Sequence, residues 1–275
     1  VGKWHRQVSM LSFEKIEAFR EKGADVDFGA FGENLVVEGF DLSKVPVGTK
    51  FQIGEAILEL TQIGKECHSH CAIYKVMGDC IMPREGVFTR VLKGGEIKAG
   101  DEITMLPLEK DRPFTAAVIT LSDKGAAGER EDKSGPLIQE MLMKEGYDVI
   151  ETLLLPDGEQ PLKHQLMRLA DQRQVNVIFT TGGTGFAERD VTPEATQAVC
   201  DRMAMGIADA IRQYSLSITG RAMLSRAVSG IRKKTLIVNL PGSPKAVKES
   251  LEYVLPYLGH GLGILRGTDG ECGNS

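Results

Sequence analysis

The chain has 275 residues, of which 42% are hydrophobic and 26% are charged, and its formal net charge is -5. This composition is that of an ordinary globular protein, long enough for two domains of about 100 to 200 residues each. The acidic balance offers no electrostatic basis for binding nucleic acid or an anionic membrane surface. We therefore expect neither as a partner, and any anion site has to be local.

Cysteine content and apolar runs indicate the compartment. The five cysteines do not form the dense, even framework of a small secreted domain, which predicts a reducing cytoplasm. No apolar stretch reaches the roughly 18 residues that span a bilayer, and the first ten residues lack the apolar core of a signal peptide. The chain begins with Val1 rather than Met, so we expect its natural start to be missing.

The first part of the chain has the pattern of a mostly β domain. Short apolar runs alternate with glycines, as expected for strands joined by turns. The runs lie at 35–37, 51–53, 57–60, 87–88 and 103–106, and only 13–22 before them has a helical pattern.

A charged, proline-ended segment at 110–113 marks a boundary, which predicts domains at 1–110 and 111–275. Strand and helix patterns then alternate, which indicates a doubly wound α/β domain with a mostly parallel sheet. The predicted strands are 115–121, 148–155, 175–180 and 235–240, and the predicted helices are 135–145, 161–172, 193–203, 207–216 and 244–258.

A glycine-rich segment, Thr180 to Gly185, follows the third predicted strand, and Thr192-Pro193 then signals the start of a helix. Glycines permit positive φ and close approach, so successive amides there can converge on an anion. Such a turn is also used for purely steric reasons. Asp190 favours a phosphate cradle, because a carboxylate beside a phosphate needs a cation such as Mg²⁺ between them. The alternative is an exposed loop aspartate.

Polar segments follow each predicted strand of this domain. In open α/β sheets ligands bind beyond the carboxyl ends of the strands, so these loops are expected to line one crevice. The loop 122–134 exceeds the usual length of about 2 to 6 residues, which favours a binding loop. The segments are Ser122-Asp123, Pro156-Asp157-Gly158, the glycine loop and 239–244.

These segments resemble the molybdopterin adenylyltransferases of the Mog type over about residues 114–265. The resemblance implies transfer of AMP from ATP to the phosphate of molybdopterin, with release of pyrophosphate and with Asp157 and Asp190 needed for turnover. The matching motifs are SD at 122–123, DKSGP at 132–136, LPD at 155–157, TTGGTG at 180–185, RDVTP at 189–193, LSR at 224–226 and NLPGSP at 239–244.

We assign Asp157 and Asp190 to catalysis, holding Mg²⁺ directly or through water, and the amides of Gly182 to Gly185 with the Thr184 hydroxyl to nucleotide phosphates. Ser243 has capping of the last helix as an equal alternative. The predicted ligand-binding residues are Ser122, Asp123, Ser134, Gly135, Thr181, Gly182, Gly183, Thr184, Gly185, Thr192, Pro193, Asp209, Ser225, Arg226, Asn239, Pro241, Gly242 and Ser243.

The basic residues Arg221, Arg226, Arg232, Lys233 and Lys234 suit the pterin phosphate or pyrophosphate, and Arg226 is the first choice because it lies in a family motif. The alternative for such charges is a solvated surface. One segment departs from the family, which usually has a Pro-Gly-Phe turn leading to a glutamate where this chain has Met205 to Asp209. The departure predicts altered pterin affinity or specificity. By resemblance we expect a homo-oligomer, a trimer.

The first half resembles a MOSC domain, a β-rich fold related to the C-terminal part of molybdenum-cofactor sulfurases, over about residues 4–106. The resemblance rests on 31–35, 47–48, the cysteine segment and 95–101. It implies a cysteine that holds sulfur or ligates molybdenum, with Cys80 the first choice, Cys67 the second and Cys71 the third. The alternatives are a zinc site in 67–71 completed by Cys80, or inert buried thiols. We expect no pyridoxal phosphate.

The leading hypothesis is a fused enzyme of molybdenum-cofactor biosynthesis, with ATP, Mg²⁺ and molybdopterin as ligands. The expected protein partner is a molybdenum-insertion protein or a sulfur donor. One alternative is a nucleotide pyrophosphatase of the competence-damage type. Another is a pterin carrier or scaffold without catalysis.

Overall fold

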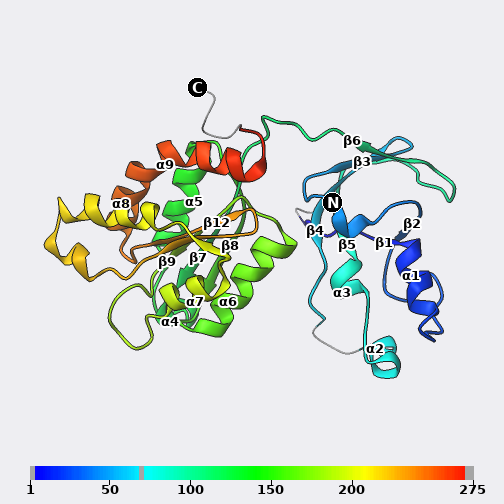
Figure 1. Cartoon of the computed structure of the whole chain (residues 1–275), viewed down its shortest axis with the longest axis horizontal. Helices are drawn as coiled ribbons and strands as arrows, with labels where there is room; N and C mark the ends of the chain where they lie inside the picture. The colour runs from blue at the N-terminus through cyan, green and yellow to red at the C-terminus, as the bar shows by residue number, and fades with distance from the viewer. Residues whose placement is uncertain (1–3, 68–70, 270–275) are drawn as a thin grey trace. The chain divides into compact units, whose positions relative to one another are not determined.

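The structure is a computed structural model that describes residues 4–67 and 71–269. The chain forms two compact units, Val1–Glu109 and Lys110–Ser275, shown in Figure 1 in blue to green and in green to red. Each unit has hydrophobic clusters of its own. Within the described ranges, the helices are all too short or too polar to cross a bilayer.

The first unit is built on one six-stranded sheet in the order β2-β1-β5-β4-β3-β6. Only β1 and β2 are parallel, and the other neighbours are antiparallel. Two register shifts between β4 and β5 add twist, so the sheet curls. The elements are β1 (Val8–Ser12), α1 (Phe13–Arg20), β2 (Leu35–Val37), η1 (Leu42–Lys44), β3 (Lys50–Ile53), β4 (Ala56–Ile63), α2 (Ala72–Met77), α3 (Met82–Glu85), β5 (Val87–Lys93) and β6 (Ile103–Leu106).

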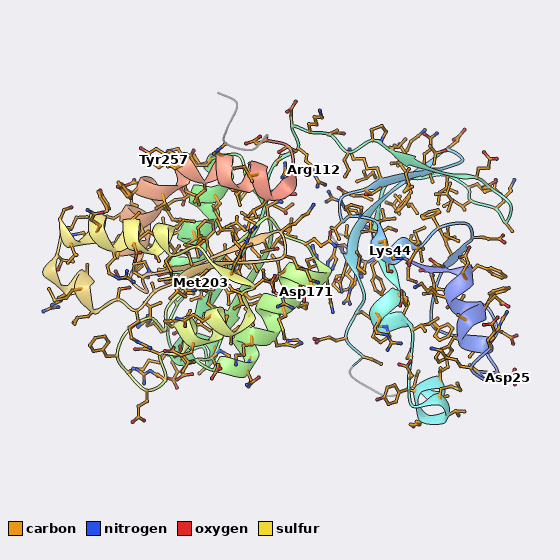
Figure 2. The ribbon with its side chains drawn as sticks, viewed as in Figure 1. Asp25, Lys44, Arg112, Asp171, Met203 and Tyr257 are labelled. Carbon is orange, nitrogen blue, oxygen red and sulfur yellow. The ribbon has the colours of Figure 1, made fainter. Side chains whose placement is uncertain are left out.

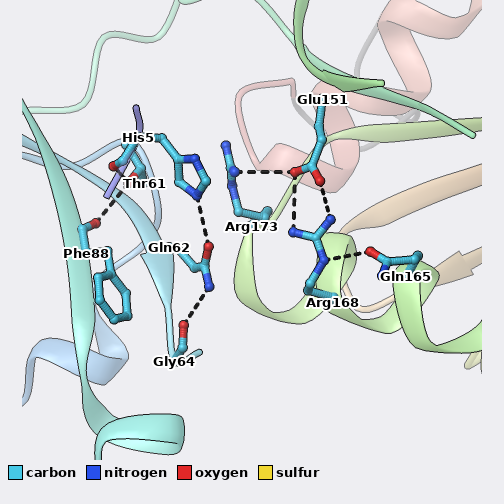
Figure 3. Close-up of polar contacts among 9 residues, drawn as sticks. All are labelled: His5, Thr61, Gln62, Gly64, Phe88, Glu151, Gln165, Arg168 and Arg173. Carbon is cyan, nitrogen blue, oxygen red and sulfur yellow. Dashed lines mark hydrogen bonds and ion pairs between the residues drawn. The ribbon is translucent and has the colours of Figure 1, made fainter. Parts of the chain in front are cut away.

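The first unit has a buried cluster on each face of this sheet, because successive residues of a strand point to opposite faces. Met10 and Val87 belong to one cluster with Phe51 and Leu60, and Leu11 and Phe88 belong to the other. Side-chain hydrogen bonds add to the sheet on β4, where the Thr61 hydroxyl donates to the His5 carbonyl at 2.6 Å (Figure 3). The predicted mostly β domain is confirmed.

The second unit is a mixed sheet covered by helices on both faces. Its strand order is β10-β11-β12-β9-β7-β8, in which β12, β9, β7 and β8 are parallel and β10 and β11 are antiparallel additions at one edge. The strands are β7 (Thr115–Leu121), β8 (Asp148–Leu155), β9 (Val177–Thr181), β10 (Arg202–Met203), β11 (Ser229–Arg232) and β12 (Thr235–Leu240). The predicted doubly wound fold is confirmed.

Alternating apolar residues along the strands explain why both faces are covered. On β7, Val118 packs with the helices α5, α8 and α9, whereas Ile119 packs with α6 and α7, and both are fully buried. The helices are α4 (Asp123–Ala126), α5 (Ser134–Lys144), α6 (Glu159–Met167), the π-helical turn η2 (Arg168–Gln172), α7 (Thr192–Val199), α8 (Met205–Leu216), the 3₁₀ turn η3 (Gly220–Leu224) and α9 (Pro244–Arg266).

Two helix ends of the second unit differ from the sequence prediction by more than two residues. The helix expected over 193–203 ends at Val199, because Arg202 and Met203 pair with β11 instead. The helix expected to end at 258 continues to Arg266, because Leu262 is fully buried and gains tertiary packing despite the nearby glycines.

Ion pairs form at the end of this sheet where the parallel strands begin, away from their carboxyl ends. The Glu151 carboxylate accepts from Arg168 and Arg173 (Figure 3). Asp171 of η2, labelled in Figure 2, binds Arg232 at 3.0 and 2.5 Å and Lys233 at 3.1 Å, both at the β11–β12 turn. Because this turn precedes β12 and the predicted crevice follows it, Arg232 and Lys233 do not serve a phosphate in that crevice.

The Asp171 carboxyl gives a pH-dependent prediction. Burial raises its pKa, but hydrogen bonds from Arg232 and Lys233 outweigh burial and hold the pKa below its usual value. A depressed carboxyl pKa contributes stability above the unfolded-state value, and this is lost as pH falls through the folded-state value. Asp171→Asn should therefore lower the unfolding free energy by about 2 kcal/mol at pH 7. Urea titrations should show that the difference from wild type shrinks below pH 4; an undiminished difference would contradict the assignment.

Candidate active site

The loops that follow β7, β9 and β12 meet at one cleft. In the parallel part of the sheet the strand order is β8-β7-β9-β12, so the chain reverses direction of winding between β7 and β9, where α/β proteins bind their ligands. The cleft has a volume of about 360 Å³. Its lining residues are Thr120, Leu121, Ser122, Gly125, Arg130, Glu131, Asp132, Lys133, Ser134, Thr181, Gly182, Gly242 and Pro244.

The glycine loop lies so close to its neighbours that side chains are excluded. Gly182 and Gly183 have φ values of 96° and 64°. A Cβ on Gly182 would lie 2.4 Å from the Leu121 carbonyl oxygen, and one on Gly183 would lie 2.4 Å from the Thr192 hydroxyl. The Thr192 hydroxyl donates to the Gly182 carbonyl at 2.9 Å. In the described part of the chain, the amides of Gly183, Thr184 and Gly185 donate no hydrogen bond, which suits an anion.

Arg226 holds the far side of this loop. Its amide donates to the Thr184 carbonyl at 3.0 Å and its Nε to the Gly185 carbonyl at 2.7 Å. Its other guanidinium nitrogens bind the Asp190 carbonyl and the Glu194 carboxylate. The expected ligand contact is therefore replaced by a positioning contact, since the guanidinium is committed to protein oxygens.

Carboxylates collect on the loops that follow β7, β8 and β9. Asp123 and Asp157 are joined reciprocally, because the Asp157 amide donates to Asp123 Oδ1 at 2.9 Å and the Asp123 amide donates to Asp157 Oδ2 at 3.2 Å. Asp190 accepts from the Ala187 amide at 2.9 Å. Burial raises the pKa of the Asp157 carboxyl; the carboxylates of Asp123 and Asp190 add to the rise, while the Asp123 amide and Arg189 oppose it.

This arrangement suits a cation that shares its ligands with a substrate. No group of three or more His, Cys, Asp or Glu side chains able to hold a metal ion occurs among residues 4–67 and 71–269. Mg²⁺ usually takes one or two carboxylates and completes its octahedron with phosphate oxygens and waters. The oxygen donors of Asp157 and Asp190 fit that role.

Several predicted site residues have structural roles. Asn239 is fully buried, and its side chain donates to Thr180 and Thr196 at 2.9 Å each and accepts from the Val228 amide, so it is committed to the core. The Ser243 hydroxyl accepts from the Ala246 amide at 3.3 Å and caps α9. These two expected ligand contacts are thus explained by packing and capping.

The other predicted residues lie at different distances from the cleft. Ser122, Ser134, Thr181, Gly182 and Gly242 line it. Gly135 adjoins it on α5, and Thr192 and Pro193 begin α7. Pro241 accepts from the Thr181 hydroxyl at 2.6 Å. Asp209 pairs with Arg212 on α8 and Ser225 accepts from the Ala227 amide, and neither lines the cleft.

Sequence reasoning missed Thr120 and Asp132 as site residues. Asp132 Oδ1 accepts from the amides of Ser134 and Gly135 at 3.0 Å each, so it caps α5 at the cleft. The signals for Asp132 were its place in the DKSGP motif at 132–136 and the length of the loop 122–134. Thr120 carried no signal beyond its place near the end of a strand.

In the first unit the thiols have unequal environments. Cys80 is 7% exposed, and burial raises its pKa, with Cys71, Cys67 and Asp79 adding to the rise. Cys71 and Cys67 are exposed, and hydrogen bonding by the Tyr74 amide at the start of α2 lowers the Cys71 pKa. Arg84, the basic residue that follows Cys80 on α3, pairs with Asp79 at 2.7 and 2.9 Å. The order of preference among the cysteines therefore reverses in favour of Cys71.

The zinc alternative depends on His68, Ser69 and His70, which lie outside the described residues. It stays an untested hypothesis. Cys67 and Cys71 flank that segment.

Two known protein families match this chain, one over each unit. A family described as a probable molybdopterin binding domain matches residues 117–260, just over half of the chain. The chain belongs to this family. A second family, the MOSC domain, matches residues 1–104. Both resemblances deduced from sequence are confirmed.

The relatives include curated enzymes. A molybdopterin adenylyltransferase of Helicobacter pylori (strain 26695) is 40% identical over 153 residues, covering 55% of this chain and 87% of the relative. The Haemophilus influenzae protein of the same name is 45% identical over 139 residues, covering 50% and 71%. The Escherichia coli K12 protein of that name is 43% identical over 140 residues, with the same coverage.

Solved structures agree with this membership. The molybdopterin biosynthesis enzyme MoaB from a Thermus species has a TM-score of 0.54 and 45% identity, covering 56% of this chain and 97% of its own. The molybdopterin biosynthesis Mog protein from Mycobacterium ulcerans has a TM-score of 0.53 and 38% identity, covering 56% and 98%. The family fold therefore accounts for the second unit.

The Arg226 clamp predicts the stability of the glycine loop. Arg226→Met should leave the fold intact but speed hydrogen exchange of the hydrogen-bonded loop amides of Ala187, Asp190 and Thr192 by at least about tenfold, because a hydrogen bond to a charged group is worth about 1.5–3 kcal/mol. The exposed Arg221, changed to Met, is the matched control and should leave this exchange unchanged. Equal exchange in the two variants would show that the clamp does not hold the loop.

The thiol environments predict different reactivities. At pH 7.5, iodoacetamide should alkylate Cys71 well before Cys80, because only the thiolate reacts and Cys80 is buried with a raised pKa. Peptide mass spectrometry over time measures both rates. The difference should vanish in urea, and faster labelling of native Cys80 would overturn the reversed order.

Proposed function

We propose that the second unit transfers AMP from ATP to the phosphate of molybdopterin, releasing pyrophosphate, in a Mg²⁺-dependent reaction. Relatives 40–45% identical over this unit carry the name molybdopterin adenylyltransferase. The observation that supports the proposal most is the position of Asp190 beside the glycine loop, whose amides at 183–185 have no partner among the described residues. Asp157 lies near enough for the Asp190 carboxylate to raise its pKa. Carboxylates repel a polyphosphate that is bound to these amides unless a cation lies between them. A Mg²⁺ ion bound to both the carboxylates and the phosphates meets that need.

The chemistry asks little of a general base. A phosphate monoester has a second pKa of about 6, so the terminal phosphate of molybdopterin is mostly dianionic at pH 7. One of its oxygens attacks the α-phosphorus of ATP and forms a new P–O bond. The bond from the α-phosphorus to the oxygen that bridges to the β-phosphorus breaks, and pyrophosphate leaves with the electron pair. The barrier therefore lies in bringing two anions together and in stabilising the leaving charge.

The residues divide this work. The amides of 183–185 bind phosphate oxygens of ATP, and Arg226 keeps them in place through the Gly185 and Asp190 carbonyls. Asp157 and Asp190 are the Mg²⁺ ligands, directly or through water. Mg²⁺ supplies neutralisation of the charge on the phosphates and on the departing pyrophosphate. Burial raises the Asp157 pKa, and Mg²⁺ binding would offset the repulsion from Asp123 and Asp190 that adds to this rise.

The first unit has a supporting role in this proposal. It binds or carries sulfur or molybdenum cofactor, and the exposed Cys71, with its lowered pKa, is the thiol best suited to it. A molybdenum-insertion protein or a sulfur donor is then the partner. The assembly is a homo-oligomer.

The experiment mixes the full chain with ATP, Mg²⁺ and molybdopterin and measures pterin-AMP and pyrophosphate by chromatography. Product that disappears when Mg²⁺ is removed by chelation supports the proposal. AMP formed without pterin would instead indicate a nucleotide pyrophosphatase. Tight binding of molybdopterin with no product would indicate a carrier or scaffold.

Asp190→Asn tests the acid directly. It should leave the melting temperature within a few degrees of wild type and reduce kcat by about 10²- to 10³-fold, the usual loss for one electrostatic group at a reacting centre. Asp148→Asn is the matched control, because Asp148 is an exposed aspartate at the start of β8, whereas the proposed site lies beyond the carboxyl ends of the strands. A rate for Asp190→Asn equal to that of the control would remove Asp190 from the mechanism.

A further inference from the structure

The cleft has a second polar side, opposite in character to the glycine loop. At the start of α5 the amides of Ser134 and Gly135 are already bound by Asp132 Oδ1, at 3.0 Å each. A carboxylate therefore occupies the place that a phosphate takes at a free helix terminus. The α5 side of the cleft disfavours a phosphate and favours a group that donates hydrogen bonds.

The charges around this side lead to the same conclusion. The cleft-lining run from Arg130 to Lys133 contains two cations and two anions, so it carries no net charge. Arg130, Glu131 and Lys133 are exposed, where solvent screens them. The amides of 183–185 remain the better place for phosphate.

Thr120 contributes an unusual group to this side. Thr120 is one of the residues that line the cleft, and it is only 6% exposed. In the described part of the chain its hydroxyl has no hydrogen-bond partner, although a buried hydroxyl normally has one. Valine has the same shape without the polar cost, so a ligand is the natural partner for this oxygen.

Gly135 shows that two oxygens face the same point. A Cβ on Gly135 would lie 2.7 Å from Thr120 Oγ1 and 2.4 Å from Asp132 Oδ2. Asp132 Oδ2 is the carboxylate oxygen that the α5 amides do not use. Any side chain at Gly135 would cover both oxygens.

We propose that the Thr120 hydroxyl and Asp132 Oδ2 bind the donor edge of an amino-substituted heterocycle, and that Thr120 thereby determines ligand specificity. This inference rests on the proposed function, whose two substrates both carry such an edge: the 6-amino group of adenine and the 2-amino-4-oxo edge of a pterin. The heterocycle lies at α5 and the phosphates lie at the glycine loop. Thr120 acts by direct contact with the ligand and has no part in bond breaking.

The test measures ligand binding by calorimetry for wild type, Thr120→Val and Thr120→Ser. The probes are two matched pairs, AMP with purine riboside 5′-monophosphate and 6-hydroxymethylpterin with its 2-oxo analogue, each differing at the amino group. For one pair, Thr120→Val should weaken binding of the amino compound about tenfold, which corresponds to the loss of one hydrogen bond. It should also remove the preference over the analogue. Thr120→Ser, which keeps the hydroxyl, should retain that preference.

Melting temperatures provide the control. Thr120→Val should melt at or above the wild-type temperature, because it removes an unpartnered buried hydroxyl. Thr235→Val is the matched variant, since the Thr235 hydroxyl donates to the Val175 carbonyl at 2.6 Å at the other end of the sheet. It should lower the melting temperature and leave ligand affinities unchanged.

The outcomes separate this inference from the proposed function. If wild type forms pterin-AMP and Thr120→Val binds both amino compounds as wild type does, only this inference is overturned. If wild type binds neither pair and forms no product, both fail. The pair that loses its preference identifies whether adenine or pterin lies at α5.

Discussion

The β9–α7 loop depends on close backbone approach that only glycine permits. Gly182 lies against the Leu121 carbonyl of the neighbouring strand, and Gly183 lies against the Thr192 hydroxyl at the start of α7. Both have positive φ. The amides that follow, at 183–185, have no hydrogen-bond partner in the described part of the chain. The proposed anion site, with Asp190 beside it, depends on this constraint.

Carboxylates at the carboxyl ends of the parallel strands lie near this loop and affect which ligands it suits. Asp123 and Asp157 are tied together by their own amides, and burial with neighbouring carboxylates raises the Asp157 pKa. Acids so arranged gain from a cation, and the amides gain from an anion. A magnesium–polyphosphate complex satisfies both sets of groups. Arg226, although basic, contributes through backbone carbonyls rather than through its charge on a ligand.

The two units separate two kinds of reactive group. The α/β unit concentrates oxygen donors and backbone amides, which suit phosphates and Mg²⁺. The MOSC unit concentrates three thiols, of which Cys71 and Cys67 are exposed and Cys80 is buried in a core cluster. Thiols and oxygen donors thus have different surroundings within one chain.

The sequence by itself determined the class of fold and most of the parallel strands, since β7, β8 and β12 have the bounds that their apolar runs predicted. It also identified the glycine loop, because glycine spacing and a following Thr-Pro are local signals. Only the tertiary structure decided that the helix after Pro193 ends at Val199, because a partner strand captures Arg202 and Met203. Edge pairings of this kind depend on residues far apart in sequence.

The same distinction applies within the site. The motifs named Arg226, Asn239 and Ser243, but whether such a side chain meets a ligand, the core or a helix end depends on what three-dimensional packing places beside it. Thr120 shows the converse, since a threonine near a strand end is ordinary in sequence and becomes notable only when its hydroxyl is buried without a partner. Residue type sets what a group can do, and long-range packing sets which of those possibilities it has left.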